Sequence, residues 1–216
     1  SAWSLDTERN EIEYGCSITL PTGVHFLARH PATGEIYVTS RFSGSVAVLR
    51  LEDAGWVGDP STRRCRLNVA RYFDSGAANT HAITFGADGA QLFVTSIIDG
   101  TITVLDTRPD GAGMVEERVR RRRWIGPEAG VVKVSPYDGL LYIANAELKR
   151  FFQLDPATLS VLKEAELSGR PFDFDFVKDE EGQQRAMMSF FADHEIGIVA
   201  IEPLALREII KVGASE

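Results

Sequence analysis

The sequence has little that would cross-link a fold covalently or place it in a membrane. Its 216 residues include two cysteines, Cys16 and Cys65, which belong to no CxxC pair or Cys/His cluster. The chain therefore encodes neither a disulfide framework nor a zinc site. We expect free thiols, with a single Cys16–Cys65 bridge as the alternative. No apolar run approaches the length of about 18 residues that a membrane span needs, and the first residues lack the features of a signal peptide.

Positive charge is also scarce. The chain carries 23 Lys and Arg against 31 Asp and Glu, for a formal net charge of −8. Binding to nucleic acid or to anionic membranes requires a basic surface, so both are disfavoured as general functions. With 44% hydrophobic residues, the chain can bury a sizeable core without metal or disulfides. The compartment cannot be read from the sequence.

The familiar short catalytic and cofactor motifs are missing as well. GxGxxG, the P-loop, GxSxG and HExxH are all absent. The sequence therefore predicts no cofactor and no metal site.

The chain does contain an internal repeat. Four segments share an apolar strand, a turn ending in glycine, an aromatic-rich strand, a second turn and another apolar strand. The turn glycines Gly34, Gly89, Gly139 and Gly182 are 55, 50 and 43 residues apart. Short strands with period-two alternation at this spacing are typical of β-propeller blades, which pack radially because both faces of each blade are apolar.

We therefore predict an all-β fold, a β-propeller of four-stranded antiparallel blades with about four and a half blades present. Tyr37, Phe93, Tyr142 and Met187 are expected at equivalent core positions, and Leu27, Ile83 and Val132 mark inner strands around one axis. The predicted boundaries are a half blade over 1–22 and full blades over 23–78, 79–128, 129–169 and 170–216.

The opening segment aligns with the last two strands of a blade. Residues 4–7 match the end of a third strand at 153–156, and residues 12–20 match the fourth strand at 161–167. An open ring leaves two apolar blade faces and a sheet edge in water. We therefore expect these blades to belong to a ring of six or seven, with further blades or a protein partner covering the open faces.

Two stretches resemble a known family. Residues 87–96 followed by 99–106 resemble the YVTN-type propeller repeat, and residues 24–52 resemble blades of the lactonase-like, 6-phosphogluconolactonase group. The resemblance implies a seven-bladed propeller, with lactone hydrolysis as one of several activities that such repeats support. The sequence differs from the lactonase group at two positions, where His25 stands in place of an arginine and Arg41 in place of a glutamate.

Polar residues on inner strands are the first functional candidates, because these strands line the central channel. His25 and His81 occupy equivalent positions in two blades. They are suited to binding a metal, to binding an anion when protonated, or to hydrogen bonding a neighbouring blade as structural groups. With Arg41 they are the candidate catalytic residues.

Alternation in residues 172–176 places Asp173 and Asp175 on one side of a strand. These carboxylates could bind a cation or ligand, or simply form a polar channel wall. Arg29, at a position that is apolar in the other repeats, is expected to pair with one of them.

One basic run stands out, over residues 118–124, where an outer strand is expected. Arg120, Arg121, Arg122 and Arg123 are followed by Trp124, which adds a stacking surface. The run fits either a solvated strand on the rim or a contact with an acidic partner. A protein partner is favoured over nucleic acid because no other basic stretch extends the patch.

Two functions therefore remain. The first is a non-catalytic propeller whose rigid channel or rim binds a protein or small ligand. The second is a lactonase-like hydrolase that uses His25 and His81 in the channel.

Overall fold

The computed structural model describes residues 2–6, 11–20, 23–53, 65–109, 115–191 and 194–213. Side chains are described for residues 16–20, 23–52, 66–109, 115–191 and 194–213. Within this part of the chain all regular structure is β, and no helix is long and apolar enough to cross a membrane. The predicted all-β fold class is confirmed.

Four antiparallel sheets of four strands follow one another along the chain, after a two-stranded hairpin. The hairpin is β1 (Ala2–Asp6) and β2 (Glu11–Cys16). Blade one is β3 (Val24–Arg29), β4 (Ile36–Ser40), β5 (Ser45–Asp53) and β6 (Cys65–Asp74). Blade two is β7 (Ile83–Phe85), β8 (Gln91–Ser96), β9 (Thr101–Asp106) and β10 (Arg118–Trp124). Blade three is β11 (Ala129–Val134), β12 (Leu141–Asn145), β13 (Arg150–Leu154) and β14 (Val161–Glu166). Blade four is β15 (Pro171–Lys178), β16 (Gln184–Phe190), β17 (Glu195–Ala200) and β18 (Ala205–Lys211).

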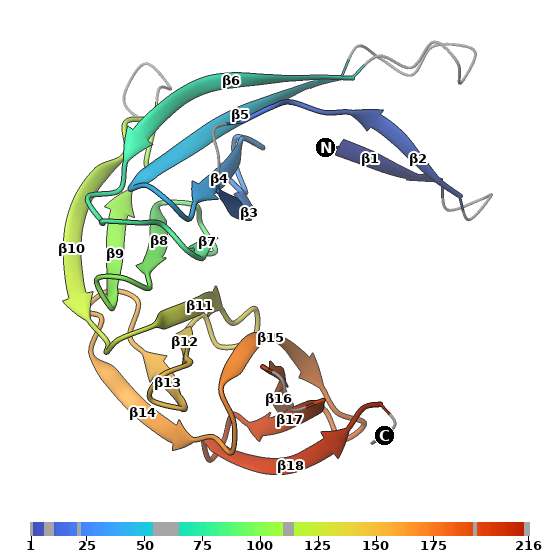
Figure 1. Cartoon of the computed structure of the whole chain (residues 1–216), viewed down its shortest axis with the longest axis vertical. Helices are drawn as coiled ribbons and strands as arrows, with labels where there is room; N and C mark the ends of the chain where they lie inside the picture. Colours follow the sequence, from blue (N-terminus) through green and yellow to red (C-terminus); the bar gives the residue numbers. More distant parts are fainter. Residues whose placement is uncertain are drawn as a thin grey trace.

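The blades stand side by side in an open arc (Figure 1). The first strand of each blade lies on the inside of the arc and the last strand on the outside, so β3, β7, β11 and β15 form the inner wall (Figure 1). The turn glycines between first and second strands, Gly34, Gly89, Gly139 and Gly182, all have φ between 70° and 77°. Glycine is favoured there because this left-handed region is costly for other residues.

Strand register identifies one cross-strand row in every blade, which we call the forward row. It takes one residue from each strand, from the inner strand to the outer. Its members are Ala28, Tyr37, Val48 and Arg71 in blade one; Thr84, Phe93, Val104 and Arg121 in blade two; Lys133, Tyr142, Gln153 and Lys163 in blade three; and Asp175, Met187, Ile198 and Glu208 in blade four.

The forward row marks the face that each blade turns to the next, which we call the forward face; the opposite side is the rear face. Tyr37 packs with Ile83 and Phe85 of blade two, and Tyr142 packs with Phe174 of blade four. Tyr37, Phe93 and Tyr142 are all 0% exposed. The three predicted core positions therefore bury their rings between neighbouring blades, where apolar burial stabilises the fold most strongly.

One predicted core residue, Met187, and one residue that marked an inner strand, Leu27, are not buried. Met187 has the expected register but is 39% exposed, because no blade covers the forward face of blade four. Leu27 is 68% exposed, since it lies on the rear face of blade one, opposite Val38. On that face, Val38 and its apolar neighbours are partly covered by Ile18 and Leu20. The alternation identified the strands correctly, but burial also depends on what packs against each face.

Cys16, at the end of β2, is disulfide-bonded, so the expectation of a free thiol there is wrong. β2 lies against β6, so the end of β2 is close to a strand that is distant in the sequence, and a search for local cysteine motifs does not detect such proximity. The side chain of Cys65 lies outside the described residues.

Candidate functional site

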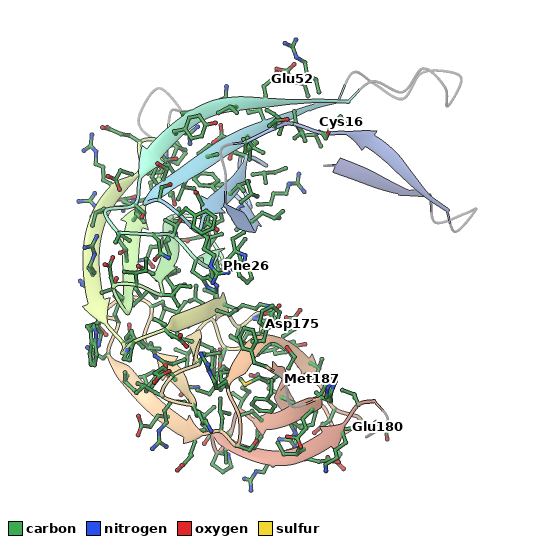
Figure 2. All side chains as sticks on the ribbon, viewed as in Figure 1. Cys16, Phe26, Glu52, Asp175, Glu180 and Met187 are labelled. Carbon is green, nitrogen blue, oxygen red and sulfur yellow. The ribbon has the colours of Figure 1, made fainter. Side chains whose placement is uncertain are left out.

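The structure brings His25 and His81 together on the inner wall. The Nε2 atoms of the two rings are 2.8 Å apart, so one imidazole donates a hydrogen bond to the other. The rings meet edge to face with centroids 4.4 Å apart, and Phe26 packs against both. Figure 2 shows Phe26 on the inner side of the arc. The two histidines, which the sequence analysis placed at equivalent positions in neighbouring blades, are therefore in direct contact.

The electrostatic surroundings favour neutral imidazoles. Burial and the positive charge of Arg41 lower the pKa of His25 below its usual value. Burial, His25 and Arg41 lower the pKa of His81 to about 4, against an opposing effect of the Gly130 backbone. Near neutral pH both rings are therefore neutral, and the N–H of one donates to the unprotonated nitrogen of the other. Arg41 supplies the positive charge beside them.

His81 is held in place through its backbone and ring. Thr39 Oγ1 in blade one donates to the His81 carbonyl oxygen at 2.6 Å, which fixes blade two against blade one. His81 Nδ1 is buried beside the Gly130 backbone and makes no hydrogen bond of normal geometry in the described structure. No three His, Cys, Asp or Glu side chains gather into a metal-binding group among the described residues. The pair is thus suited to proton transfer or to polar ligand binding.

Lys133, which the sequence analysis did not single out, lies beside the carboxylate pair of β15. Its Nζ is 3.2 Å from Asp173 Oδ1 and 3.9 Å from Asp175 Oδ2. Arg29, the expected partner, is exposed and its guanidinium lies near Gly34, in the turn of its own hairpin. That expectation is wrong because Lys133, on the adjacent inner strand β11, is closer to β15. The sequence did carry a signal, since Lys133 interrupts the apolar stretch of β11.

The basic run forms β10, the outer strand of blade two, and all seven of its residues are exposed. This matches the predicted outer-strand placement. Arg118 pairs with Glu116, and Arg120 pairs with Asp106 at 2.7 Å. Together with Arg108, Arg120 holds the pKa of Asp106 well below its usual range.

The other three arginines of β10 have no carboxylate partner among the described residues. Arg121 donates to the Ala157 carbonyl oxygen of blade three, and Arg122 Nε donates to Thr103 Oγ1 at 3.2 Å. Arg123 has no ion-pair partner in the described part of the chain, and Trp124 is 65% exposed. The rim strand therefore presents uncompensated guanidinium groups beside an exposed indole.

Sequence reasoning missed one buried ionic cluster near the rim. Arg71 donates to Glu35, Glu117 and the Tyr37 hydroxyl, with a shortest distance of 2.6 Å to Glu117 Oε1. Burial opposes ionisation of Glu35, but hydrogen bonds from Arg71 and Arg50 outweigh it and lower the pKa. A cavity of about 570 Å³ lies beside this cluster. The charged groups of the cluster pair with one another. The cluster therefore joins blades one and two and leaves no unpaired charge for a ligand.

Comparison with known proteins shows the fold alone. No family model and no curated protein matches the chain. A functionally unknown protein from Desulfotomaculum acetoxidans is similar in structure, with a TM-score of 0.71, 18% identity, and coverage of 98% of this chain and 66% of that one. A periplasmic gluconolactonase of Pseudomonas aeruginosa has a TM-score of 0.70 and 14% identity, with coverage of 99% and 64%.

A third structure is more distant. Hydrazine synthase of Kuenenia stuttgartiensis has a TM-score of 0.59 and 15% identity, covering 90% of this chain and 51% of that one. The chain thus spans about half to two thirds of these proteins. Their different activities on related architectures mean that function must be argued from the residues present.

Proposed function

We propose that this chain is a non-catalytic β-propeller that presents the basic rim strand β10 to an acidic protein partner. The observation that carries this proposal is that all seven residues of β10 are exposed and that Arg122 and Arg123 lack carboxylate partners among the described residues.

The physical basis is charge placed on a rigid strand. Arginine forms bidentate hydrogen bonds with carboxylates, and strand geometry fixes the spacing of successive guanidinium groups. Trp124 adds apolar area and a face for stacking. Because the chain as a whole has a net charge of −8, polyanions are not attracted to its surface in general. The isolated basic strand orients an acidic partner that binds there.

The test uses a fluorescein-labelled peptide of alternating Glu and Tyr, titrated with the full chain and followed by fluorescence anisotropy. Arg122→Ser with Arg123→Ser is expected to weaken binding by about tenfold or more, because each loses a charge-assisted contact. Trp124→Ala should weaken it less. Arg118→Ser is the matched control, since Glu116 already pairs with Arg118.

Two results would contradict the proposal. One is peptide binding that the paired substitution leaves unchanged. The other is single-stranded DNA of equal charge binding as tightly as the peptide, which would indicate a polyanion site instead.

A second candidate function, hydrolysis of a cyclic ester, is favoured by the contact between His25 and His81. In this scheme the neutral His25, oriented by its hydrogen bond to His81, accepts a proton from water that attacks the lactone carbonyl. The ring C–O bond of the ester then breaks, and the leaving alkoxide takes that proton from His25, which becomes neutral again. Arg41 would stabilise the developing negative charge on the carbonyl oxygen. The structural similarity to a gluconolactonase supplies the substrate class to test.

The assay measures gluconolactone opening against the uncatalysed rate. The hydrolase function predicts a rate above background that falls by about 100-fold or more in His25→Gln, the scale of a lost general base. Arg122→Ser should leave that rate unchanged. A rate equal to background, or one indifferent to His25→Gln, removes this candidate.

A further inference from the structure

The forward face of blade four has the features of a blade–blade interface but is open to solvent. In blades one to three the second-strand residue of the forward row is buried by the next blade. In blade four that residue is Met187, which lies with Asp175 on the side of the last blade that no other blade faces (Figure 2). The face carries a groove of about 250 Å³ lined by Lys133, Asp173, Asp175, Met187, Ser189 and Ile196.

Blades one and two also place a hydroxyl group to bond the next blade, whereas blade three has Ala144 at that position. Two residues after the buried aromatic of the forward row, Thr39 donates to the His81 carbonyl oxygen and Thr95 donates to the Gly130 carbonyl oxygen, each at 2.6 Å. The corresponding residue of blade four is Ser189, whose Oγ bonds only within its own blade in the described structure, to the Asp173 carbonyl oxygen at 3.3 Å. Ser189 therefore has acceptor capacity left, and its single O–H is free to turn from this long bond toward a neighbouring inner strand.

The charges at the outer end of the row specify what kind of surface fits. In the first three blades this residue is basic and reaches across to the next blade: Arg71 to Glu117, Arg121 to the Ala157 carbonyl oxygen, and Lys163 to Glu202. In blade four it is Glu208, which is exposed and has no cationic partner among the described residues.

At the inner end of the row, blades three and four also differ in charge. Blade three has Lys133, which pairs across the interface with Asp173 of blade four. Blade four has Asp175 at the corresponding position, and its side chain is 81% exposed. Blade four thus presents apolar Met187 and Ile198 between two acidic ends.

We propose that the forward face of blade four binds the rear face of a further β-blade, supplied from outside residues 1–216, that carries basic side chains at its inner and outer strands. The apolar middle of the row packs against that blade, Ser189 bonds a backbone group of its inner strand, and Asp175 and Glu208 pair with its basic residues.

A second copy of this chain fits poorly. Blades two and four offer acidic groups to the blade behind them, Glu117 and Glu202. If the rear face of either blade packed on blade four, Glu117 or Glu202 would lie opposite Glu208 and repel it. Face-to-face pairing of two identical blade-four surfaces would bring Asp175 near Asp175, and the rear face of blade one is partly covered by Ile18 and Leu20. Like charges at an interface are a strong discriminator against a wrong partner.

The test joins a second copy of residues 75–125, which contain blade two and its natural connection, to Val212 of the full chain. One fusion keeps the added copy unchanged and another carries Glu117→Lys in the added copy, which places a basic group opposite Glu208. Hydrogen exchange of the β15 and β16 amides is compared with the unfused chain. Amides of β12 and β13 serve as the internal control for correct folding.

The lysine-bearing fusion is expected to slow exchange in β15 and β16 by about tenfold or more, and the unchanged fusion by clearly less. Adding Met187→Asp to the lysine-bearing fusion should restore the rates of the unfused chain. Equal rates in fused and unfused chains, or equal protection by both fusions, would overturn the proposal. So would a dimer of the unfused chain, seen by light scattering, that Met187→Asp dissociates.

Discussion

Blades three and four have the same strand order and the same register, yet their forward rows meet different surroundings. Tyr142 of blade three is fully buried, and its hydroxyl donates to Asp138 Oδ2 at 2.7 Å. Met187 of blade four occupies the corresponding position and remains partly in solvent. The comparison shows that position within the repeat sets which residue points at the neighbour, whereas burial requires that the neighbour be present.

The difference extends from packing to charge. Lys133 and Lys163 at the ends of the blade-three row each contact an acidic residue of blade four. The ends of the blade-four row are acidic themselves. A repeat unit can therefore keep its fold while it changes the partner it specifies, because exposed ends of a strand row tolerate charge reversal and buried centres do not.

The largest expected effect comes from emptying the buried row. Tyr142→Ala should lower the free energy of unfolding by about 4 kcal/mol, because it removes a ring packed between two blades and leaves a cavity. Met187→Ala should lower it by about 1 kcal/mol, since much of that side chain is already in water. Urea unfolding followed by fluorescence measures both. Similar losses for the two variants would contradict the asymmetry between the faces.

The next effect concerns the basic end of the blade-one row, where Arg71 is held between two buried carboxylates. Arg71→Met should cost about 3 kcal/mol of unfolding free energy, because it leaves Glu117 buried without a cation and Glu35 with Arg50 alone. Replacing both carboxylates with Gln in the same background should recover part of the loss. A cost as small as that of an ordinary surface substitution would show that water reaches the cluster freely.

Much of the fold could be predicted because the repeat is written in local patterns. Period-two alternation located the strands, and the turn glycines located the hairpins that join the first and second strands. Tyr37, Phe93 and Tyr142 were identified as equivalent from their place in the repeat, and the structure buries all three. Met187 and Leu27 show the limit, since a single sequence does not state which faces acquire a neighbour.

The candidate site was less predictable because its contacts join distant parts of the chain. Equivalent positions suggested that His25 and His81 lie at one level, but their contact depends on how blades one and two are rotated against each other. Lys133 was missed because a lone lysine in a strand is ordinary on an exposed face. Arg71 was missed because its two carboxylate partners are distant in the sequence. Glu35 lies in the turn between β3 and β4, and Glu117 lies in the segment before β10.

The histidine pair offers a smaller comparison, between the half-buried ring of His81 and the exposed ring of His25. The pKa of His81 is lowered to about 4, below its unfolded value, so the unfolded chain binds more protons in the acid range. Stability should therefore be highest above the unfolded pKa and fall as pH decreases toward 4. By about pH 5 this histidine should account for roughly 2 kcal/mol of loss.

The measurement compares the pH dependence of unfolding free energy in the unmodified chain and in His81→Asn. The variant should show a shallower decline between neutral pH and pH 5. Parallel curves for the two proteins would show that His81 titrates as it does in the unfolded chain.

The smallest expected effects lie at the outer ends of the rows, where the comparison of blades three and four is most direct. Lys163→Ala removes an exposed contact with Glu202, so it should cost about 0.5 kcal/mol, and less in high salt because screening already weakens such pairs. Glu208→Ala removes no ion pair within the described residues and should leave the unfolding free energy unchanged to within a few tenths of a kcal/mol. The effects of the two substitutions should become similar once a basic surface meets blade four. In the fusion that carries lysine opposite Glu208, Glu208→Ala should then destabilise about as much as Lys163→Ala does. If Glu208→Ala is equally neutral in both proteins, the acidic end of the row does not select its partner by charge, and docking on this face depends on Met187 and Ile198 alone.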